Sequence, residues 1–254
     1  DDYREMVEPD GIKTYDALRF ILDFAQETGD AIHVVYGGSY DFNKILRNIP
    51  QSRLEKLAAG QAICFWDIRV EWRMGKYLRL AKKNKDGETV GKSVTLYDVV
   101  AFFQCSFVAA CDSYLGDNFI RREMVVENKE ARAAFDMANL AEIREYNRVE
   151  LQNLILLMTE LKDRLSAVGL RPKAWFGPGA IATALFQRES IKEYMAESPM
   201  SVRLYSARAY FGGRFEPFKF GIMEQPVWQY DINSAYPAAL RNVPSLAHGY
   251  WRED

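Results

Sequence analysis

Acidic side chains stand at several positions of this chain where their spacing would suit phosphoryl chemistry. Near the C-terminus, Asp231 ends an apolar stretch and precedes Ser234, Ala235 and Tyr236. A carboxylate at a strand end can hold divalent cations that neutralise phosphate charge, and a turn after it can offer backbone N–H groups to a triphosphate. The alternative is an ordinary Asp at a strand end followed by a surface turn, because short motifs also arise by chance.

A glycine pair lies upstream of Asp231, in the segment Tyr210–Arg214 (YFGGR). Gly212 and Gly213 would let the backbone approach a phosphate chain closely, while Tyr210 and Arg214 would supply a ring and a positive charge. Taken alone, a glycine turn between two strands explains this segment better.

The N-terminal half contains two further acidic positions. Asp41 follows the turn in Tyr36–Asp41 (YGGSYD), and its alternative role is to cap the helix that comes after it. Tyr146 and Glu150 are four residues apart, so a helix places them on one face. Here the alternative is a half-buried Tyr beside a solvated Glu.

A phenylalanine-rich segment lies between these two positions. Phe102, Phe103 and Phe107 could stack on nucleic-acid bases, which contributes about 1–3 kcal/mol per base. Such helices more often belong to a core, so we expect at least two of the three rings to be buried.

The overall composition bounds the class of protein. The 254 residues are 48% hydrophobic with a net charge of −2, so phosphate binding would need local excesses such as 67–92, where eight basic residues face four acidic ones. The alternative to phosphate binding is that these basic residues form an ordinary solvated surface. The three cysteines form no CxxC pair and there are only two histidines, which argues against a zinc site or a disulfide framework. The sequence contains no long apolar run, so we expect no membrane partner.

Hydrophobic periodicity and turn residues predict an α/β protein. We expect a domain boundary between 165 and 203. The predicted helices span 14–27, 41–46, 101–115, 128–165 and 177–187; the predicted strands span 31–36 and 93–99, with a basic hairpin at 62–72 and 76–81.

The segment Tyr230–Pro237 (YDINSAYP) closely resembles motif A, DxxSLYP, of family B DNA polymerases, with Ala235 where the family usually has Leu. Tyr210–Arg214 resembles the YxGG motif of the protein-primed branch of that family. This resemblance implies that Asp231 is a catalytic metal ligand, that Ser234, Ala235 and Tyr236 bind the nucleotide, and that Tyr236 packs under the incoming sugar. It also implies that Tyr210, Gly212, Gly213 and Arg214 contact DNA.

The N-terminal half resembles the 3′–5′ exonuclease domain of the same family, which has a ribonuclease H-like fold. Tyr36–Asp41 is similar to its second motif, with Tyr36 or Gly37 in place of the usual Asn. Tyr146–Glu150 is similar to its third motif, with Glu150 in place of Asp. The resemblance implies that Asp41 and Glu150 bind catalytic metal, that Tyr146 orients a water, and that Phe103 and Phe107 stack on single-stranded DNA.

The expected architecture is therefore an incomplete ribonuclease H-like exonuclease domain (1–165), a helical connector (166–202) and the start of a polymerase palm (203–254). The parent would be a DNA-directed DNA polymerase with two-metal sites for Mg²⁺ or Mn²⁺, completed only at full length, so that the isolated chain is inactive. Implied partners are primer-template DNA, single-stranded DNA and deoxynucleoside triphosphates. Priming by a terminal protein and the source of the gene stay open.

The default location is the cytoplasm, or a host cytoplasm for a phage or plasmid gene. The rival function is a noncatalytic DNA-binding module derived from a polymerase whose exonuclease site has decayed. Glu150 and the missing Asn favour that rival, whereas Asp231 and Tyr236 oppose it.

Overall fold

The computed structural model describes residues 3–131, 139–190, 199–209, 221, 224–226, 228, 232 and 234–243. The chain divides into two compact units, residues 1–188 and residues 189–254. The division falls inside the segment 166–202 that the sequence predicts as a connector. Each unit is described by itself below.

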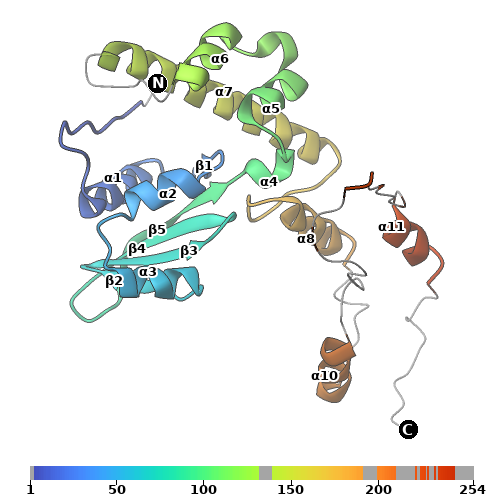
Figure 1. Ribbon diagram of the computed structural model, residues 1–254. Helices are drawn as coiled ribbons and strands as arrows, with labels where there is room; N and C mark the ends of the chain where they lie inside the picture. The colour runs from blue at the N-terminus through green and yellow to red at the C-terminus, as the bar shows by residue number, and fades with distance from the viewer. Residues whose placement is uncertain are drawn as a thin grey trace. The chain divides into compact units, whose positions relative to one another are not determined.

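A five-stranded mixed sheet forms the centre of the first unit (Figure 1). Its strand order is β1-β5-β4-β3-β2, in which β1 runs parallel to β5 and all other neighbours are antiparallel. The α/β class predicted from the sequence is thereby confirmed. The strands are β1 (His33–Val35), β2 (Ile63–Phe65), β3 (Ile68–Arg73), β4 (Tyr77–Lys83) and β5 (Thr89–Asp98).

The basic hairpin is present where its alternating pattern predicts it. In β3 buried apolar residues alternate with residues of the opposite face, as a period of two requires, and β4 keeps this alternation up to Leu80, after which Ala81 is also buried. Gly75 supplies the positive φ (66°) of the connecting turn. The predicted first arm is in fact two strands, because Trp66 adopts φ 56° and reverses the chain between β2 and β3.

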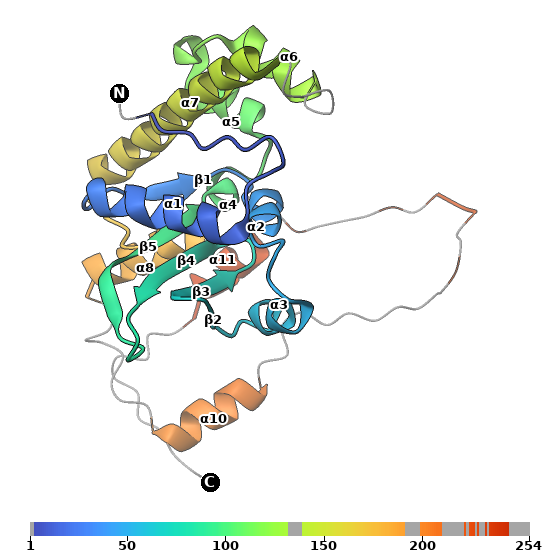
Figure 2. The same ribbon diagram turned by 90° about the vertical axis from the view of Figure 1, so that its left-hand side faces the viewer.

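Three helices cover one face of this sheet: α1 (Thr14–Glu27), α2 (Ser39–Ile45) and α3 (Gln51–Ala58). Their apolar side chains form one core with Val70, Leu78 and Leu80 of the sheet. In Figure 2 α1 lies along the strands, with α2 beside its first turns. The helix-contributed residues of this core include Leu18, Leu22, Phe42 and Leu57.

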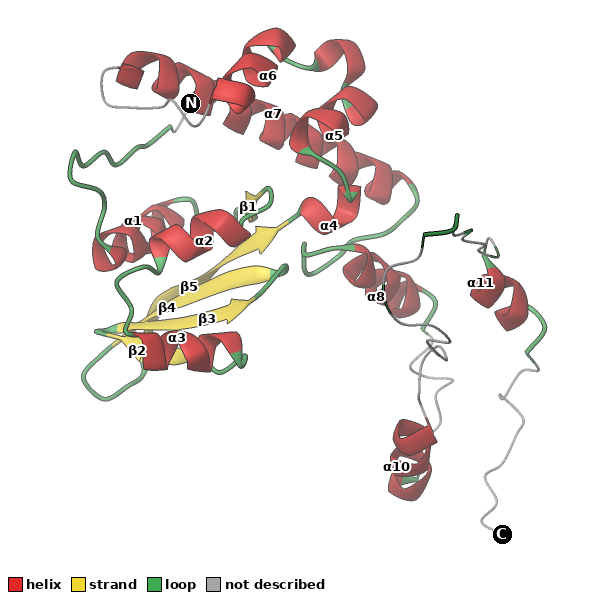
Figure 3. Cartoon of the chain, in the orientation of Figure 1, coloured by secondary structure: helices red, strands yellow, loops and turns green. Residues whose placement is uncertain are grey.

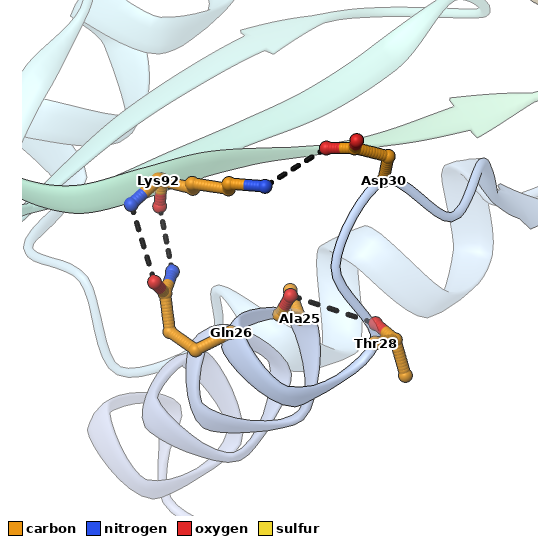
Figure 4. Close-up of polar contacts among 5 residues, drawn as sticks. All are labelled: Ala25, Gln26, Thr28, Asp30 and Lys92. Carbon is orange, nitrogen blue, oxygen red and sulfur yellow. Dashed lines mark hydrogen bonds and ion pairs between the residues drawn. The ribbon is translucent and has the colours of Figure 1, made fainter.

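The end of α1 is joined to β5 by hydrogen bonds of a side-chain amide (Figure 4). Gln26 Nε2 donates to the Lys92 carbonyl (2.8 Å), and the Lys92 N–H donates to Gln26 Oε1 (3.2 Å). Lys92 Nζ also donates to Asp30 Oδ1 at 2.8 Å. Gln26 thus gives this part of β5 the two backbone partners that a neighbouring strand would otherwise supply.

The helices that follow the sheet build a second and a third core. They are α4 (Val100–Phe103), α5 (Phe107–Tyr114), the 3₁₀ turn Gly116–Asn118, α6 (Arg122–Ala131), α7 (Leu140–Ala167) and α8 (Pro178–Arg188). Figure 3 shows that the strands lie together, while helices and the loops between them make up the rest of the described chain. The second core gathers Phe107, Cys111, Val125, Tyr146 and Leu157.

Two of the predicted helices differ from the observed ones. The single helix expected at 101–115 is broken, because Gln104 adopts a left-handed conformation (φ 54°) and ends α4, and Ser106 starts α5 by accepting a hydrogen bond from the Ala109 N–H. The expected helix 128–165 is replaced by α6, which begins at Arg122, and α7, which continues to Ala167. The helix predicted at 177–187 is confirmed as α8.

The described part of the second unit contains two helices, α10 (Met200–Ala209) and α11 (Ala235–Leu240). Among all the helices that the structure describes, none is both long and apolar enough to cross a membrane.

Candidate functional site

The described candidate residues of the first unit lie around the carboxyl ends of the parallel strands β1 and β5. Val35 pairs with Asp98, so both strands end at the same edge of the sheet. The buried Asp98 Oδ1 accepts hydrogen bonds from the N–H groups of Gly37 (2.9 Å) and Val100 (3.2 Å). This carboxylate therefore fixes the two chain segments that leave the sheet at this edge.

The turn after β1 depends on its two glycines. Gly37 adopts φ 69°, a conformation that side chains disfavour. Gly38 has an ordinary φ, but a Cβ there would lie 2.5 Å from Val35 Cγ2 and 3.0 Å from the Phe42 ring. The turn thus brings the start of α2 tightly against β1.

Asp41 lies in the first turn of α2 and is exposed to solvent. The alternative that Asp41 caps this helix is wrong, because α2 begins earlier, at Ser39, with Gly38 at the capping position. A negative charge in a first turn is nevertheless favourable, since the N-terminal end of a helix carries partial positive charge.

Aromatic rings fill the space beside this edge. Tyr36 stacks with Phe103 (centroids 5.8 Å apart) and meets Phe107 edge-on (5.1 Å), while its hydroxyl donates to the Cys105 carbonyl (2.9 Å). Burial, with the Cys105 contact, raises the pKa of Tyr36 well above its ordinary value. Tyr36 is therefore a neutral hydrogen-bond donor that ties β1 to the segment between α4 and α5.

Phe107 connects this cluster to the predicted third motif. Lys129 of α6 places its Nζ 4.9 Å from the Phe107 ring centroid and 2.6 Å from Glu150 Oε1. Contacts thus run from Tyr36 through Phe107 and Lys129 to Glu150, and they bring the predicted second and third motifs to one cluster. Glu150 is half-buried there, and its charge is balanced by a lysine.

Burial separates the predicted aromatic residues into different roles. Tyr146 is almost fully buried in the second core, which agrees with a packing role. Of the three phenylalanines only Phe107 is buried, whereas Phe102 and Phe103 are half-buried, so the expectation of two buried rings is wrong. Phe107 has no open face for a base, because Tyr36 and Lys129 contact its ring.

A buried thiol also belongs to this cluster. Burial raises the pKa of Cys111 to about 12, which makes this thiol unreactive at neutral pH. The other two cysteines, Cys64 and Cys105, are exposed.

The donor set at this edge does not fit a metal centre. Within the described residues, no group of three or more His, Cys, Asp or Glu side chains is placed to hold an ion. Asp41 is exposed on α2, and Glu150 already has a cationic partner.

The predicted polymerase residues belong to the second unit. Asp231 and Tyr210–Arg214 lie outside the residues that the structure describes. Ser234, Ala235 and Tyr236 are exposed at the start of α11, where the Ala235 N–H donates to the Ile232 carbonyl (3.3 Å). Ser234 adopts φ 57°, so the chain turns sharply just before this helix.

Two residues of the cluster were not singled out by the sequence. Asp98 is buried and tied to backbone amides, and its only sequence signal was a polar residue at the end of an apolar strand. Lys129 gave no signal, because its partners Phe107 and Glu150 are 22 and 21 residues away.

Comparison with known proteins finds one family match, which lies in the C-terminal part of the chain. Residues 184–249 match the family described as DNA polymerase type B, organellar and viral. This matched segment includes Tyr210–Arg214 and Tyr230–Pro237 and leaves residues 1–183 unassigned. No curated protein and no solved structure matches the chain.

Proposed function

We propose that this chain is part of an enzyme that extends a DNA primer on a template with deoxynucleoside triphosphates, because residues 184–249 match the family described as DNA polymerase type B, organellar and viral. The observation that carries the proposal is the family match, which coincides with the two polymerase-like motifs. These were identified from the residues alone. Primer-template DNA and nucleotides are the corresponding substrates.

Asp231 is the proposed catalytic carboxylate of the polymerase site. It would hold Mg²⁺ or Mn²⁺, which in nucleotidyl transfer neutralises charge on the phosphates and aligns the attacking 3′-oxygen. Tyr236 would pack against the sugar of the incoming nucleotide. Tyr210, Gly212, Gly213 and Arg214 would contact the DNA backbone, since two glycines permit close approach and Arg214 carries a positive charge.

The first unit is proposed to derive from a proofreading exonuclease of ribonuclease H-like fold. Support comes from the order of its motifs and from the cluster that joins Tyr36 to Glu150. A specific observation favours the second candidate, a DNA-binding module without nuclease activity. The Lys129 ammonium already neutralises Glu150, and a metal ion would have to displace it.

The test of the polymerase proposal is primer extension by the full product of the gene. Asp231→Asn should lower extension by at least about 100-fold, because an amide neither carries charge nor holds the ion firmly. Asp163→Asn, at an exposed position on α7, is the matched control and should retain activity. Unchanged extension by Asp231→Asn would refute the assignment.

The isolated 254-residue chain should not extend a primer in the presence of Mg²⁺. One palm carboxylate cannot hold two ions in the geometry that the reaction needs. Robust extension by the purified chain would show that a second carboxylate is already present within it.

A further inference from the structure

The sheet of the first unit has a second face, opposite to the core that α1, α2 and α3 cover. In β3 and β4 the core-facing residues alternate with Arg69, Glu71 and Arg73 on one strand and with Tyr77, Arg79, Ala81 and Lys83 on the other. At these paired positions the face carries four cations and one carboxylate. It is therefore strongly positive although the whole chain has a net charge of −2.

Strand register places three of these cations around one small residue. Arg69 pairs directly with Ala81, and Arg79 and Lys83 flank Ala81 on the same side of β4. Diagonal neighbours in an antiparallel pair are about 7–8 Å apart, so Arg69 has both other cations within reach of one extended anionic chain. We refer to Arg69, Arg79 and Lys83 as the cation triad.

Two members of the triad, Arg79 and Lys83, are held by neutral groups rather than by carboxylates. Arg79 Nε donates to Thr95 Oγ1 (3.0 Å), and its guanidinium lies over the Tyr77 ring (5.1 Å to the centroid). Lys83 Nζ donates to Thr89 Oγ1 (2.8 Å). Within the part of the chain that the structure describes, no acidic side chain forms an ion pair with any member of the triad.

Glu71, the one carboxylate of the face, is occupied elsewhere. It accepts a hydrogen bond from the Tyr77 hydroxyl (2.8 Å) and pairs with Arg73 (3.5 Å). These contacts lower the pKa of Glu71, with the Tyr77 hydrogen bond as the largest cause, so it stays charged and bound to its own partners. The strand register places Arg79 directly opposite Glu71, and the positive charge of Arg79 also lowers the pKa of Glu71.

From this arrangement we propose that the cation triad is a binding surface for the phosphodiester backbone of single-stranded DNA, separate from the polymerase motifs of the second unit. The choice of DNA as the partner rests on the proposed function. The ligand chemistry rests on geometry: Arg79 uses Nε internally, which leaves its two terminal amino groups for a phosphate, and Arg binds phosphate oxygens in this forked manner. Because the triad lies on rigid strands, little ordering is needed on binding.

The test measures the salt dependence of binding of labelled oligothymidylate to the 254-residue chain by fluorescence anisotropy. Each phosphate contact on a single strand contributes about 0.7 to the slope of log affinity against log salt. The triple variant Arg69→Ala, Arg79→Ala, Lys83→Ala should therefore lose about 2 from that slope. The matched control is Lys13→Ala, Lys56→Ala, Lys162→Ala, which removes the same charge from exposed positions on other elements and should keep the slope.

Two further measurements separate the outcomes. In the wild-type chain, oligothymidylate should shield Lys83 but not Lys56 from an amine-modifying reagent, which tests the surface even if the triple variant does not fold. Polyglutamate serves as a second probe. If the triad bound polyglutamate as tightly as it binds oligothymidylate, the partner would be an acidic protein surface, and the proposal would be overturned. Equal slopes for the triple variant and its control would also overturn it, while the Asp231→Asn extension assay judges the polymerase proposal independently.

Discussion

At the scale of single residues, Asp98 has the most concentrated role in the first unit. Its buried carboxylate satisfies two backbone N–H groups, those of Gly37 and Val100, at the edge where β1 and β5 end. A buried donor that loses its acceptor costs about 1–3 kcal/mol, and hydrogen bonds to charged acceptors lie at the upper end of the usual range. Asp98 therefore has a structural role, although it lies at the carboxyl end of a parallel strand, where catalytic carboxylates are often found.

Asp98→Ala should lower the free energy of unfolding by about 1–3 kcal/mol, because two part-buried N–H groups lose their charged acceptor together. Urea denaturation followed by circular dichroism would measure this as a lower midpoint with an unchanged slope. Asp163→Ala, exposed on α7, is the control and should stay within about 0.5 kcal/mol. A stable Asp98→Ala variant would mean that water replaces the carboxylate.

Gly38 offers a second test at this scale, because its requirement is steric rather than conformational. Gly38→Ala should destabilise the fold by about 1–3 kcal/mol, since the new Cβ would lie 2.5 Å from Val35 Cγ2. Gly179→Ala in α8 meets no atom within 4 Å and should be neutral or stabilising by up to about 1 kcal/mol. Both variants replace a glycine by an alanine, so the difference between their urea-denaturation midpoints excludes the general effect of that replacement. Similar shifts of the two midpoints would contradict the steric explanation.

At the scale of elements, the sequence predicted the strands and the helices α1, α2 and α8 of the first unit because their periodicity is local, but it did not predict α3. It missed the break between α4 and α5, since the left-handed Gln104 has no glycine or proline to announce it. It also missed that β2 and β3 are separate strands, for the same reason at Trp66. Backbone reversals at ordinary residues are imposed by tertiary packing, which a window of sequence does not contain.

The joint between α1 and β5 gives a prediction at this scale. Gln26→Ala should lower the free energy of unfolding by about 0.5–1 kcal/mol, because the exposed Lys92 N–H and C=O exchange a fixed partner for water. Gln26→Glu should restore only the acceptor and fall between alanine and wild type. Hydrogen exchange at the Lys92 amide would check the mechanism directly, with faster exchange expected in Gln26→Ala; unchanged exchange would assign the stability effect to another cause.

At the scale of the whole molecule, the chain separates into two units. The first is characterised by its fold, whereas the second is characterised mainly by its similarity to a known family. The first unit, residues 1–188, has three hydrophobic cores and a sheet, and the family match reaches only its last residues, 184–188. The second contains most of the matched polymerase segment. The polymerase-like residues were identifiable from sequence because a short motif carries them, whereas the Lys129 and Glu150 pair was not, because chain folding alone brings the two together.

A chain ending at Arg188 should therefore fold independently. All three cores lie within it, so the denaturation midpoint of residues 1–188 should equal that of the corresponding transition in the full chain. Urea titrations of the two proteins, monitored by tryptophan fluorescence and circular dichroism, would measure this. A markedly lower midpoint for the shorter chain would show that the second unit contributes to the stability of the first.

The parallel pairing of β1 with β5 has a consequence for the order of folding. Short turns connect β2, β3, β4 and β5, but His33 meets Leu96 only after the whole meander has been synthesised and closed. Closing the long loop between β1 and β5 costs chain entropy before the contact between these strands can stabilise the fold. The meander of β2 to β5 should therefore form in the transition state, and β1 should pair with β5 afterwards. In stopped-flow experiments Leu80→Ala should slow folding, whereas Val35→Ala should mainly accelerate unfolding.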